Sequence, residues 1–187
     1  MKLEEAQKIA EEIKGWLEPY CEPGRCVIAG SIRRRRPEVN DVELLCIPLP
    51  IDPLVKKTYR VDDHQCLDRV DIVLQCLIKA NGLKYRLNAK GSKTYGPQNK
   101  LLTHVASGMP VDIFSTDEEC WATAMVVRTG PKASNIRIAI AAKNKGWRFN
   151  AYGSGFTRGD DSKIICRTER EVFEAVDYKY FEPWERR

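Results

Sequence analysis

The sequence predicts an α+β fold in two parts, residues 1–117 and residues 118–187. Helical and strand-like segments alternate without an internal repeat. Acidic residues lie on strand candidates of the first part, whereas the excess of positive charge lies in the second. With 30% charged and 43% hydrophobic residues, the composition is that of a globular protein and not of a disordered or fibrous one.

The first part opens with a predicted amphipathic helix and continues mainly with strands. Apolar residues recur at helical spacing from Leu3 to Leu17, and Pro19 ends this helix. Short apolar runs bounded by glycine, proline or polar turns predict strands, and a longer stretch ending at Asn81-Gly82 predicts a second helix. The strand candidates are 26–29, 39–47, 83–89, 100–106 and 111–114, and the second helix is 62–80.

The second part is predicted to contain helices around a set of short strands. The turn Thr129-Gly-Pro131 separates the first two helices, and Gly146 is placed to end the second of them. Thr168 precedes an acid by three residues, which is typical of the start of a helix. The helices are 118–127, 132–145 and 168–176, with the short strands in 147–167.

Three carboxylates lie on strand candidates that are otherwise apolar. Asp41 and Glu43 are two residues apart, and side chains alternate along a strand, so we expect both on one face. Asp112 would complete the set if its strand lies beside the first. Like charges on an apolar strand are costly unless a cation lies between them. This arrangement therefore favours a divalent metal that serves phosphoryl transfer.

Gly30-Ser31 ends a strand candidate about ten residues before the carboxylate pair. Exposed backbone N–H groups and a hydroxyl at such a strand end are suited to holding phosphates. Arg33 or Arg34 could reach the same phosphates. Each motif alone is common, but the combination and its spacing are specific.

The positive charge is unevenly distributed along the chain. Residues 1–120 hold 18 basic and 18 acidic side chains, so the net charge of +5 comes entirely from residues after Cys120. Residues 121–150 contain six basic residues and no acid, which favours contact with a polyanion. The alternative is a helix face exposed only to solvent. The candidates for DNA contact are Lys132, Arg137, Lys143, Lys145 and Arg148.

Several other features argue against alternative classes of protein. No apolar run approaches the roughly 20 residues of a membrane-spanning helix, and the N-terminal residues do not resemble a secretion signal. No two of the seven cysteines form a CxxC pair, so we expect reduced thiols in a cytosol. His64 and His104 match no metal-binding spacing and are expected to be structural or surface residues.

The motifs together resemble a known family. Gly30-Ser-Ile-Arg-Arg34 followed by Asn40-Asp-Val-Glu43 is similar to the pattern of the family X DNA polymerases, within the nucleotidyltransferase superfamily. The segments Thr129-Gly130, Asn135, Lys145-Gly146 and Asn150-Ala-Tyr-Gly153 resemble the family's nucleotide-binding turn, the helix after it and the entry to its thumb. Thr168-Glu-Arg-Glu-Val-Phe-Glu-Ala175 and Tyr180-Phe-Glu-Pro-Trp-Glu-Arg186 resemble its C-terminal end. The likeness is greatest to minimal viral members, which consist of palm and thumb.

The resemblance implies a nucleotidyltransferase palm at 1–117 and a small α/β thumb at 118–187. It implies a DNA-directed polymerase that adds dNMP from a dNTP to a primer 3′ hydroxyl by two-metal chemistry, in short-gap filling or repair. Primer–template or gapped DNA would be the partner, with two Mg²⁺, or Mn²⁺, as cofactors. The enzyme would act as a monomer in the cytoplasm, or in a host cytoplasm or nucleoid if viral, without membrane attachment or secretion.

The resemblance also implies roles for individual residues. Asp41 and Glu43 would bridge both metals, and Asp112 would bind the catalytic metal beside the primer hydroxyl. The incoming nucleotide would be bound by Gly30, Ser31, Arg34, Thr129, Gly130 and Asn135.

Three positions depart from the family pattern. Glu43 replaces the usual Asp, which lengthens one metal ligand by a methylene. Val127-Arg128 stands where relatives carry aromatic residues that pack on the sugar, so selection against ribonucleotides is in question. Met109-Pro110 stands where a basic residue often precedes the third Asp.

Two alternative functions remain open from the sequence. The first is a template-independent nucleotidyltransferase acting on RNA or another acceptor, and the acid-free stretch 121–150 argues only against a small acceptor. The second is a nucleic-acid-binding module without catalysis, against which the presence of all three carboxylates argues.

Overall fold

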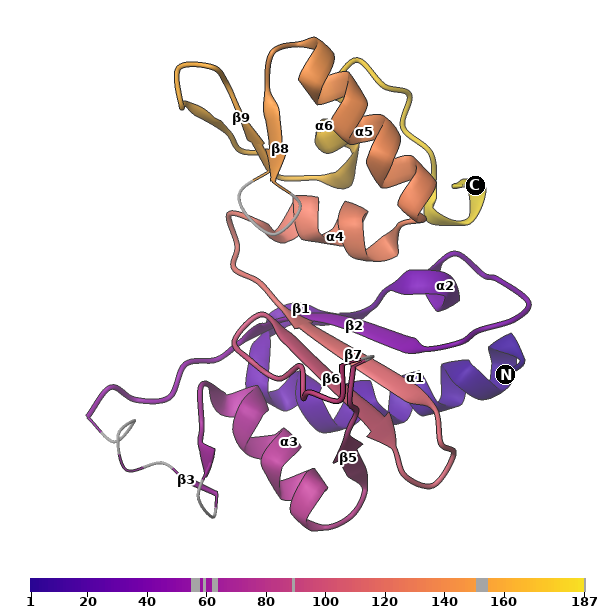
Figure 1. The fold of residues 1–187 in the computed structure, drawn as a ribbon, viewed down its shortest axis with the longest axis vertical. Coiled ribbons are helices and arrows are strands. Elements are labelled where there is room, and N and C mark those ends of the chain that lie inside the picture. The colour runs from indigo at the N-terminus through magenta and orange to yellow at the C-terminus, as the bar shows by residue number, and fades with distance from the viewer. Residues whose placement is uncertain (55–57, 59, 62–63, 89, 151–154, 187) are drawn as a thin grey trace.

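The computed structural model describes residues 1–54, 58, 60–61, 64–88, 90–150 and 155–186. The predicted strand 83–89, the predicted helix 62–80 and the Asn150-Ala-Tyr-Gly153 motif each include residues outside this description. Figure 1 shows a central sheet with α1 (Leu3–Leu17) and α3 (Arg69–Lys79) on one face and the second part of the chain on the other. Within the described residues, no helix is both long and apolar enough to cross a lipid bilayer.

The central sheet has five strands in the order β1-β2-β7-β6-β5. β2 and β7 run parallel, and the other neighbouring pairs are antiparallel. The mixed sheet with helices confirms the predicted α+β class. The strands are β1 Cys21–Ile28, β2 Val42–Pro48, β5 Leu83–Tyr85, β6 Asn99–His104 and β7 Pro110–Ser115.

Helix α1 covers the sheet with the face that its sequence pattern predicts. Ala6, Ala10, Ile13 and Leu17 are fully buried, and their spacing of three or four residues places them on one side of the helix. They pack with buried residues of the strands and of α3 in one hydrophobic core. This core holds the sheet in place from one face and leaves the other face for the functional side chains.

Strand β2 begins at Val42 and not at residue 39 as the sequence predicts. The backbone of Val39 is used elsewhere, because its N–H donates to the carbonyl oxygen of Met1 at 2.9 Å. Its carbonyl oxygen in turn accepts from the N-terminal ammonium group at 3.1 Å. Residues 39–41 therefore lead into the sheet without belonging to it.

Helix α3 begins at Arg69, later than the predicted start at residue 62. The side chain of Asp68 caps the helix by accepting from the backbone N–H of Asp71 at 2.8 Å. Before the cap, β3 (Arg60–Val61) and β4 (His64–Gln65) form a small antiparallel ribbon.

The buried carboxylate of Asp71 explains why the chain is not helical before the cap. It accepts hydrogen bonds from the Tyr95 hydroxyl at 2.6 Å and the Leu67 backbone N–H at 2.7 Å. It also pairs with Nε2 of His64 at 3.0 Å. Burial alone would raise the pKa of Asp71, but these partners hold the pKa below its ordinary value. The structural role expected for His64 is thus confirmed.

The second part contains two helices joined by a tight turn. Helices α4 (Trp121–Thr129) and α5 (Lys132–Asn144) confirm the prediction, although α4 is shifted by a few residues toward the C-terminus. Gly146 ends α5 with a left-handed backbone (φ 74°), as expected of a glycine at this position.

A small sheet and a short helix complete the second part. Thr168 caps α6 (Glu169–Glu174) by accepting from the backbone N–H of Glu171 at 3.2 Å, which confirms the predicted helix start. Phe156 and Phe173 are fully buried in a second hydrophobic core that is separate from the first. The strands of the small sheet are β8 Arg148–Asn150, β9 Gly155–Thr157 and β10 Lys163–Ile164.

Candidate active site

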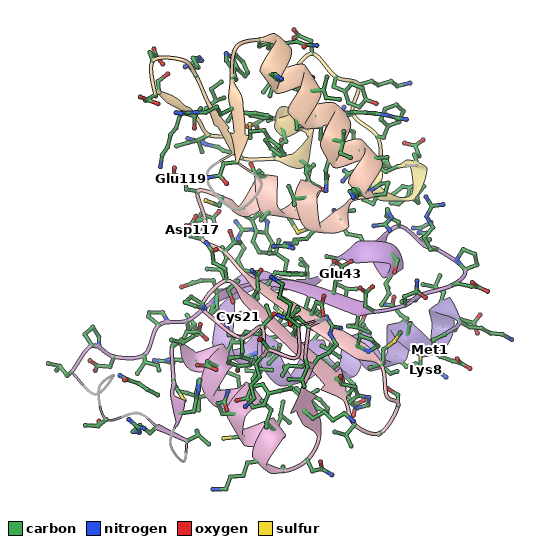
Figure 2. The ribbon with its side chains drawn as sticks, in the orientation of Figure 1. Met1, Lys8, Cys21, Glu43, Asp117 and Glu119 are labelled. Carbon is green, nitrogen blue, oxygen red and sulfur yellow. The ribbon has the colours of Figure 1, made fainter. Side chains whose placement is uncertain are left out.

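Glu43 and Asp112 lie opposite each other on the open face of the central sheet. They are direct partners in the parallel pairing of β2 with β7, so the expected adjacency of the two strands is confirmed. Leu45 and Phe114, each two residues further along, pack against Met125 of α4. Because residues two apart share a face, both carboxylates point toward the second part of the chain. In Figure 2, Glu43 lies between the sheet and the helices of the second part.

Asp41 joins this pair from the loop before β2. It does not lie on the strand, as the sequence analysis expected, but its charge acts on both Glu43 and Asp112. Burial and, after it, the charges of Asp41 and Asp112 together raise the pKa of Glu43 to about 7, against the effect of nearby arginines. Burial also raises the pKa of Asp112. The site therefore concentrates negative charge that a cation would stabilise.

The donor chemistry of these three carboxylates fits a divalent ion such as Mg²⁺, which prefers a few carboxylate oxygens and keeps its other positions for water or phosphate. As placed in the described part of the chain, no three His, Cys, Asp or Glu side chains are gathered closely enough to hold an ion. The guanidinium group of Arg86 instead forms an ion pair with Oδ1 of Asp112.

Gly30 allows the loop before α2 (Gly30–Arg33) to lie directly against Glu43. A Cβ atom at position 30 would lie 1.8 Å from Oε2 of Glu43, and the φ of 60° is also unfavourable for other residues. The backbone N–H of Ala29 donates to the Glu43 carbonyl oxygen at 2.8 Å. The loop at Gly30 and strand β2 are thus fixed to each other. A site that holds phosphates next to metal ligands requires this arrangement.

Three candidate nucleotide-binding residues carry buried polar atoms that have no hydrogen-bond partner among the described residues. These atoms are Oγ of Ser31, Nε of Arg34 and Oδ1 of Asn135. Buried polar atoms without a partner are rare in folded proteins, and a bound ligand is one explanation of them. All three belong to residues that the sequence analysis assigned to nucleotide binding.

The structure also brings the two halves of the candidate nucleotide site together. Arg34 donates through Nη1 to the carbonyl oxygen of Thr129. A Cβ atom on Gly130 would lie 3.2 Å from the same Nη1, so the turn and the arginine are in contact. Asn135 donates through Nδ2 to the carbonyl oxygen of Val127 at 2.9 Å, which fixes α5 to the end of α4.

Comparisons with known proteins agree with this arrangement. Residues 124–187 match the family model described as DNA polymerase beta thumb. Repair DNA polymerase X of African swine fever virus (isolate Tick/Malawi/Lil 20-1/1983) is 28% identical over 171 residues, which cover 86% of this chain and 80% of the viral protein. Both matches indicate that the chain is related to the family X DNA polymerases.

Two crystal structures of Leishmania infantum polymerase beta establish the fold independently. One is a ternary P/T complex and the other a ternary gap complex, with TM-scores of 0.73 and 0.74. Each is 20% identical to this chain and covers 100% of it, and the matches cover 76% and 70% of the Leishmania chains. The central sheet therefore corresponds to a polymerase palm, and the matched C-terminal region to a thumb.

The four consecutive arginines of this polymerase, Arg33 to Arg36, all contact the thumb. Arg33 forms a two-bond ion pair with Glu169 at 2.9 and 2.6 Å, and Arg35 lies over the ring of Trp184 at 4.4 Å. Arg36 donates to the carbonyl oxygen of Arg186 at 2.9 Å. Of the two arginines considered for phosphate binding, only Arg34 retains a buried donor without a partner.

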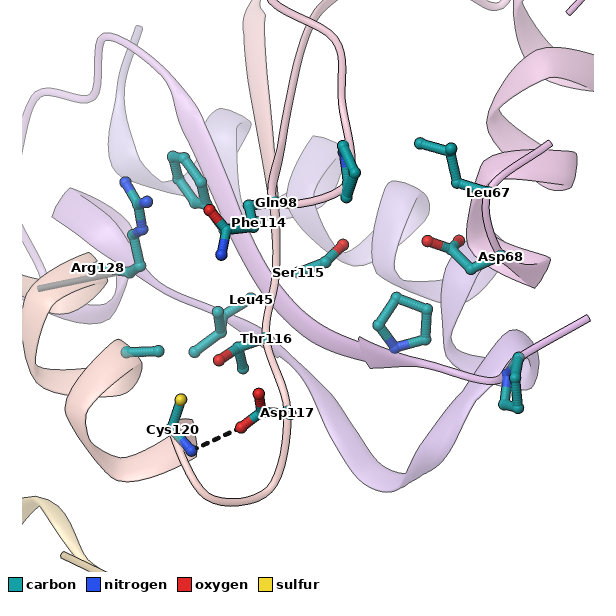
Figure 3. Close-up of a pocket in the computed structure, with 14 residues that line it drawn as sticks. Leu45, Leu67, Asp68, Gln98, Phe114, Ser115, Thr116, Asp117, Cys120 and Arg128 are labelled. Atoms are coloured by element: carbon teal, nitrogen blue, oxygen red, sulfur yellow. Dashed lines mark hydrogen bonds between the residues drawn. The ribbon is translucent and has the colours of Figure 1, made fainter. Parts of the chain in front are cut away.

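Arg128 is held away from the nucleotide turn by contacts with the palm. Its guanidinium group lies 3.5 Å from the centre of the Phe114 ring, and Nη2 donates to Oδ1 of Asn99 at 3.2 Å. Figure 3 shows the side chain beside Phe114. Arg128 thus connects α4 to the palm and lowers the pKa of Glu43 and Asp112, in opposition to burial.

A cavity of about 330 Å³ lies between α4 and the ends of β2 and β7 (Figure 3). Leu45, Phe114 and Arg128 line it on the palm and thumb sides. Asp117, at the start of the connection to α4, accepts from the backbone N–H of Cys120 at 2.8 Å. The carboxylates Glu43 and Asp112 do not line this cavity, so it lies beside the candidate catalytic site and not in it.

The five candidate DNA-binding residues divide into two groups. Lys145 is paired with Asp177 at 2.7 Å, Arg148 is paired with Asp161, and Arg137 donates to the Tyr178 hydroxyl at 3.4 Å. Lys132 and Lys143 are exposed on α5, and no ion pair is recorded for either among the described residues. These two lysines are therefore available to an external anion.

Sequence reasoning missed Arg86 and Glu169. Arg86 stands alone in a strand candidate, and its partner Asp112 is 26 residues away. Glu169 belongs to a recognised helix start, but its partner Arg33 is 136 residues away. The sequence signal was that the buried carboxylates and the arginine cluster each need a partner of opposite charge. Only the tertiary structure identifies which residue that partner is.

Proposed function

We propose that this chain is a DNA-directed DNA polymerase that adds dNMP units to a primer 3′ hydroxyl, in short-gap filling or repair. The pairing of Glu43 with Asp112 across β2 and β7, close to Asp41, is the observation that carries the proposal. The viral relative is named a repair polymerase, and one matched Leishmania structure is a gap complex.

Asp41, Glu43 and Asp112 would hold two divalent ions, Mg²⁺ or Mn²⁺, which when bound would stabilise the attacking and leaving oxygens of the phosphoryl transfer. The negative charge collected at these carboxylates supports this assignment.

The incoming nucleotide would bind between the palm and thumb. The backbone at Gly30, the Ser31 hydroxyl and Arg34 would hold its triphosphate. Oγ of Ser31 and Nε of Arg34 are buried without a hydrogen-bond partner among the described residues, which supports this role. Thr129, Gly130 and Asn135 would contact the sugar and base from the thumb side. Because Arg34 contacts Thr129 directly, triphosphate binding and sugar placement would depend on each other.

DNA would lie along the thumb helix α5. Lys132 and Lys143 would contact phosphates, with Arg137 beside them and Lys145 and Arg148 contributing less because acidic partners already hold them. The division into a palm at 1–117 and a thumb at 118–187 stays a prediction. The central sheet ends at Ser115 and the thumb model begins at residue 124, which supports it. We expect the enzyme to act as a monomer.

Replacing Asp112 with Asn tests the proposal. We expect nucleotide addition to fall by more than about a thousandfold, because one ligand is lost while side-chain volume is kept. The measurement is primer extension with matched gapped, open-template and single-stranded substrates, with Asp117→Asn as the control. Residual activity within about tenfold of the parent would remove Asp112 from the catalytic set. Equal extension of single-stranded primers would favour the template-independent alternative.

A further inference from the structure

Arg86 lies next to Leu101 in a row of neighbouring residues that runs across the palm sheet through Leu101, Asp112 and Glu43. It follows directly after β5, and its backbone N–H donates to the Leu101 carbonyl oxygen at 3.1 Å. Leu101 is the partner of Asp112 across β6 and β7, and Asp112 is the partner of Glu43. Arg86 reaches over Leu101 and forms an ion pair with Oδ1 of Asp112. Its side chain is 27% exposed, so it remains partly accessible to solvent.

The charges around Asp112 show what Arg86 contributes. Burial and the nearby charge of Asp41 raise the pKa of Asp112, whereas Arg86 and Arg128 lower it. Of these two arginines, Arg86 is the one that forms a recorded hydrogen bond with the carboxylate. Arg86 is therefore the arginine in direct contact with the carboxylate of Asp112.

The position of Arg86 also answers a question that the sequence raised. Met109 and Pro110, which precede Asp112 along the chain, are uncharged, and Pro110 begins β7. Arg86 supplies a cation to the same carboxylate from a different strand, 26 residues away in sequence.

We propose that Arg86 is a positioning residue that serves as the counter-ion of Asp112 in the free enzyme and is exchanged for a divalent cation when that cation binds. The proposal rests on the proposed function, because it takes Asp112 as a metal ligand. A divalent ion and a guanidinium group repel each other at one carboxylate, so binding of the ion breaks the ion pair. The released guanidinium group stays on the open face of the sheet, where we expect it to contact a phosphate of the primer strand.

The first test is Mn²⁺ binding to the free protein, measured by loss of the electron paramagnetic resonance signal of free Mn²⁺. Arg86→Ala is expected to bind Mn²⁺ roughly fivefold more tightly, because the competing partly exposed ion pair is gone. Arg86→Gln, which keeps most of the side-chain volume, should show the same direction if the alanine variant folds poorly. Lys84→Ala, two residues away on the same face of β5, should leave Mn²⁺ affinity unchanged. Unchanged or weaker binding in both Arg86 variants would overturn the proposal.

A second arm separates this proposal from the proposed function. Asp112→Asn should weaken Mn²⁺ binding in the parent and in the Arg86→Ala background. If it does not, Asp112 is no metal ligand and the proposed site itself fails. If Asp112→Asn weakens binding but the Arg86 variants do not tighten it, only the exchange is wrong.

The third arm tests where the released guanidinium group goes. In the presence of Mn²⁺, the dependence of primer–template affinity on salt should be weaker by about one unit of slope in Arg86→Ala than in the parent. Lys84→Ala serves again as the matched control. An unchanged slope in Arg86→Ala would show that Arg86 makes no phosphate contact after exchange and would overturn that part of the proposal.

Discussion

Two basic segments of this polymerase look alike in sequence and differ in structure. The arginines at 33–36 of the palm all contact residues of the thumb, including Thr129, Glu169 and Trp184. Lys132 and Lys143 of α5 instead extend into solvent, with no ion pair recorded among the described residues. The first segment connects the two parts of the enzyme, and the second is open to a partner.

The difference shows that the number of basic residues in a sequence segment does not tell how many of them are free to bind a partner. Both segments are rich in basic residues and each contained candidates for binding phosphates, although Glu38 follows the arginines closely. Glu169 reaches Arg33 because α6 packs against α4, which in turn packs against α2, the helix that contains Arg33. A cation whose partner is distant in sequence contributes to folding, whereas a cation without such a partner can contribute to binding.

The largest effect is expected from removing the partner of the arginines. Glu169→Ala should lower the free energy of unfolding by about 3 kcal/mol, because Arg33 and the buried Arg186 both lose their carboxylate. Denaturant unfolding measures this, with Glu174→Ala, an exposed acid on the same helix, as the control. A loss no larger than that of the control would mean that the arginine run does not hold the thumb.

A smaller effect on the free energy of unfolding is expected when the pH is lowered. Burial alone would raise the pKa of Glu169, but Arg33 and Arg186 outweigh burial and hold the pKa below its ordinary value. Stability from this group is therefore complete above the ordinary glutamate pKa of about 4.3 and is lost as pH falls through the lower folded pKa. The difference in unfolding free energy between the parent and Glu169→Gln should shrink below about pH 4. A constant difference down to the acid limit would contradict this.

Substitutions of the exposed lysines of α5 should affect DNA binding and not the free energy of unfolding. Replacing Lys132 and Lys143 together with alanine should weaken primer–template binding about tenfold and reduce the salt slope by about two, without much sequence dependence. The matched control replaces Lys145 and Arg148, which already have acidic partners. The distinction between the two groups is wrong if the control pair costs as much as the test pair. Adding Arg137→Ala should deepen the effect.

The smallest effect concerns sugar selection. Arg128 contacts Phe114 and Asn99, and Val127 is small, so we expect neither side chain to crowd the 2′ position. We expect discrimination of under about a thousandfold between deoxyribonucleotides and ribonucleotides, and an increase of several-fold in Val127→Tyr. The measurement is the ratio of kcat/KM for matched nucleotides on one gapped template. A parent ratio far above that bound would show that the backbone at Thr129-Gly130 suffices.

Much of the fold follows from local sequence signals. The periodicity of α1, the apolar strands that carry Glu43 and Asp112, and the glycine that ends α5 all gave correct elements. Each is decided by neighbours within a few residues. The start of α3 was wrong, because the buried Asp71 and its partner Tyr95, 24 residues later, determine where that helix begins.

The residues of the candidate site could be predicted from the sequence, but the partners that balance their charges could not. The motifs identified the carboxylates and the residues around the triphosphate position. They could not show that Arg33 forms an ion pair with Glu169 or that Arg128 lies over the ring of Phe114. Nor could they show that Arg86 forms an ion pair with Asp112. Each of these pairings joins strands or helices that are adjacent only in the folded chain, so no spacing in the sequence encodes it.

The contact between palm and thumb has an apolar end and a charged end. Leu45, Phe114 and Met125 form the first, and Arg33 with Glu169 forms the second. Apolar contacts weaken on cooling, whereas ion pairs weaken with salt and acid. Cooling would therefore weaken the apolar end of this contact, and acid the charged end, so the two ends respond to different solvent conditions.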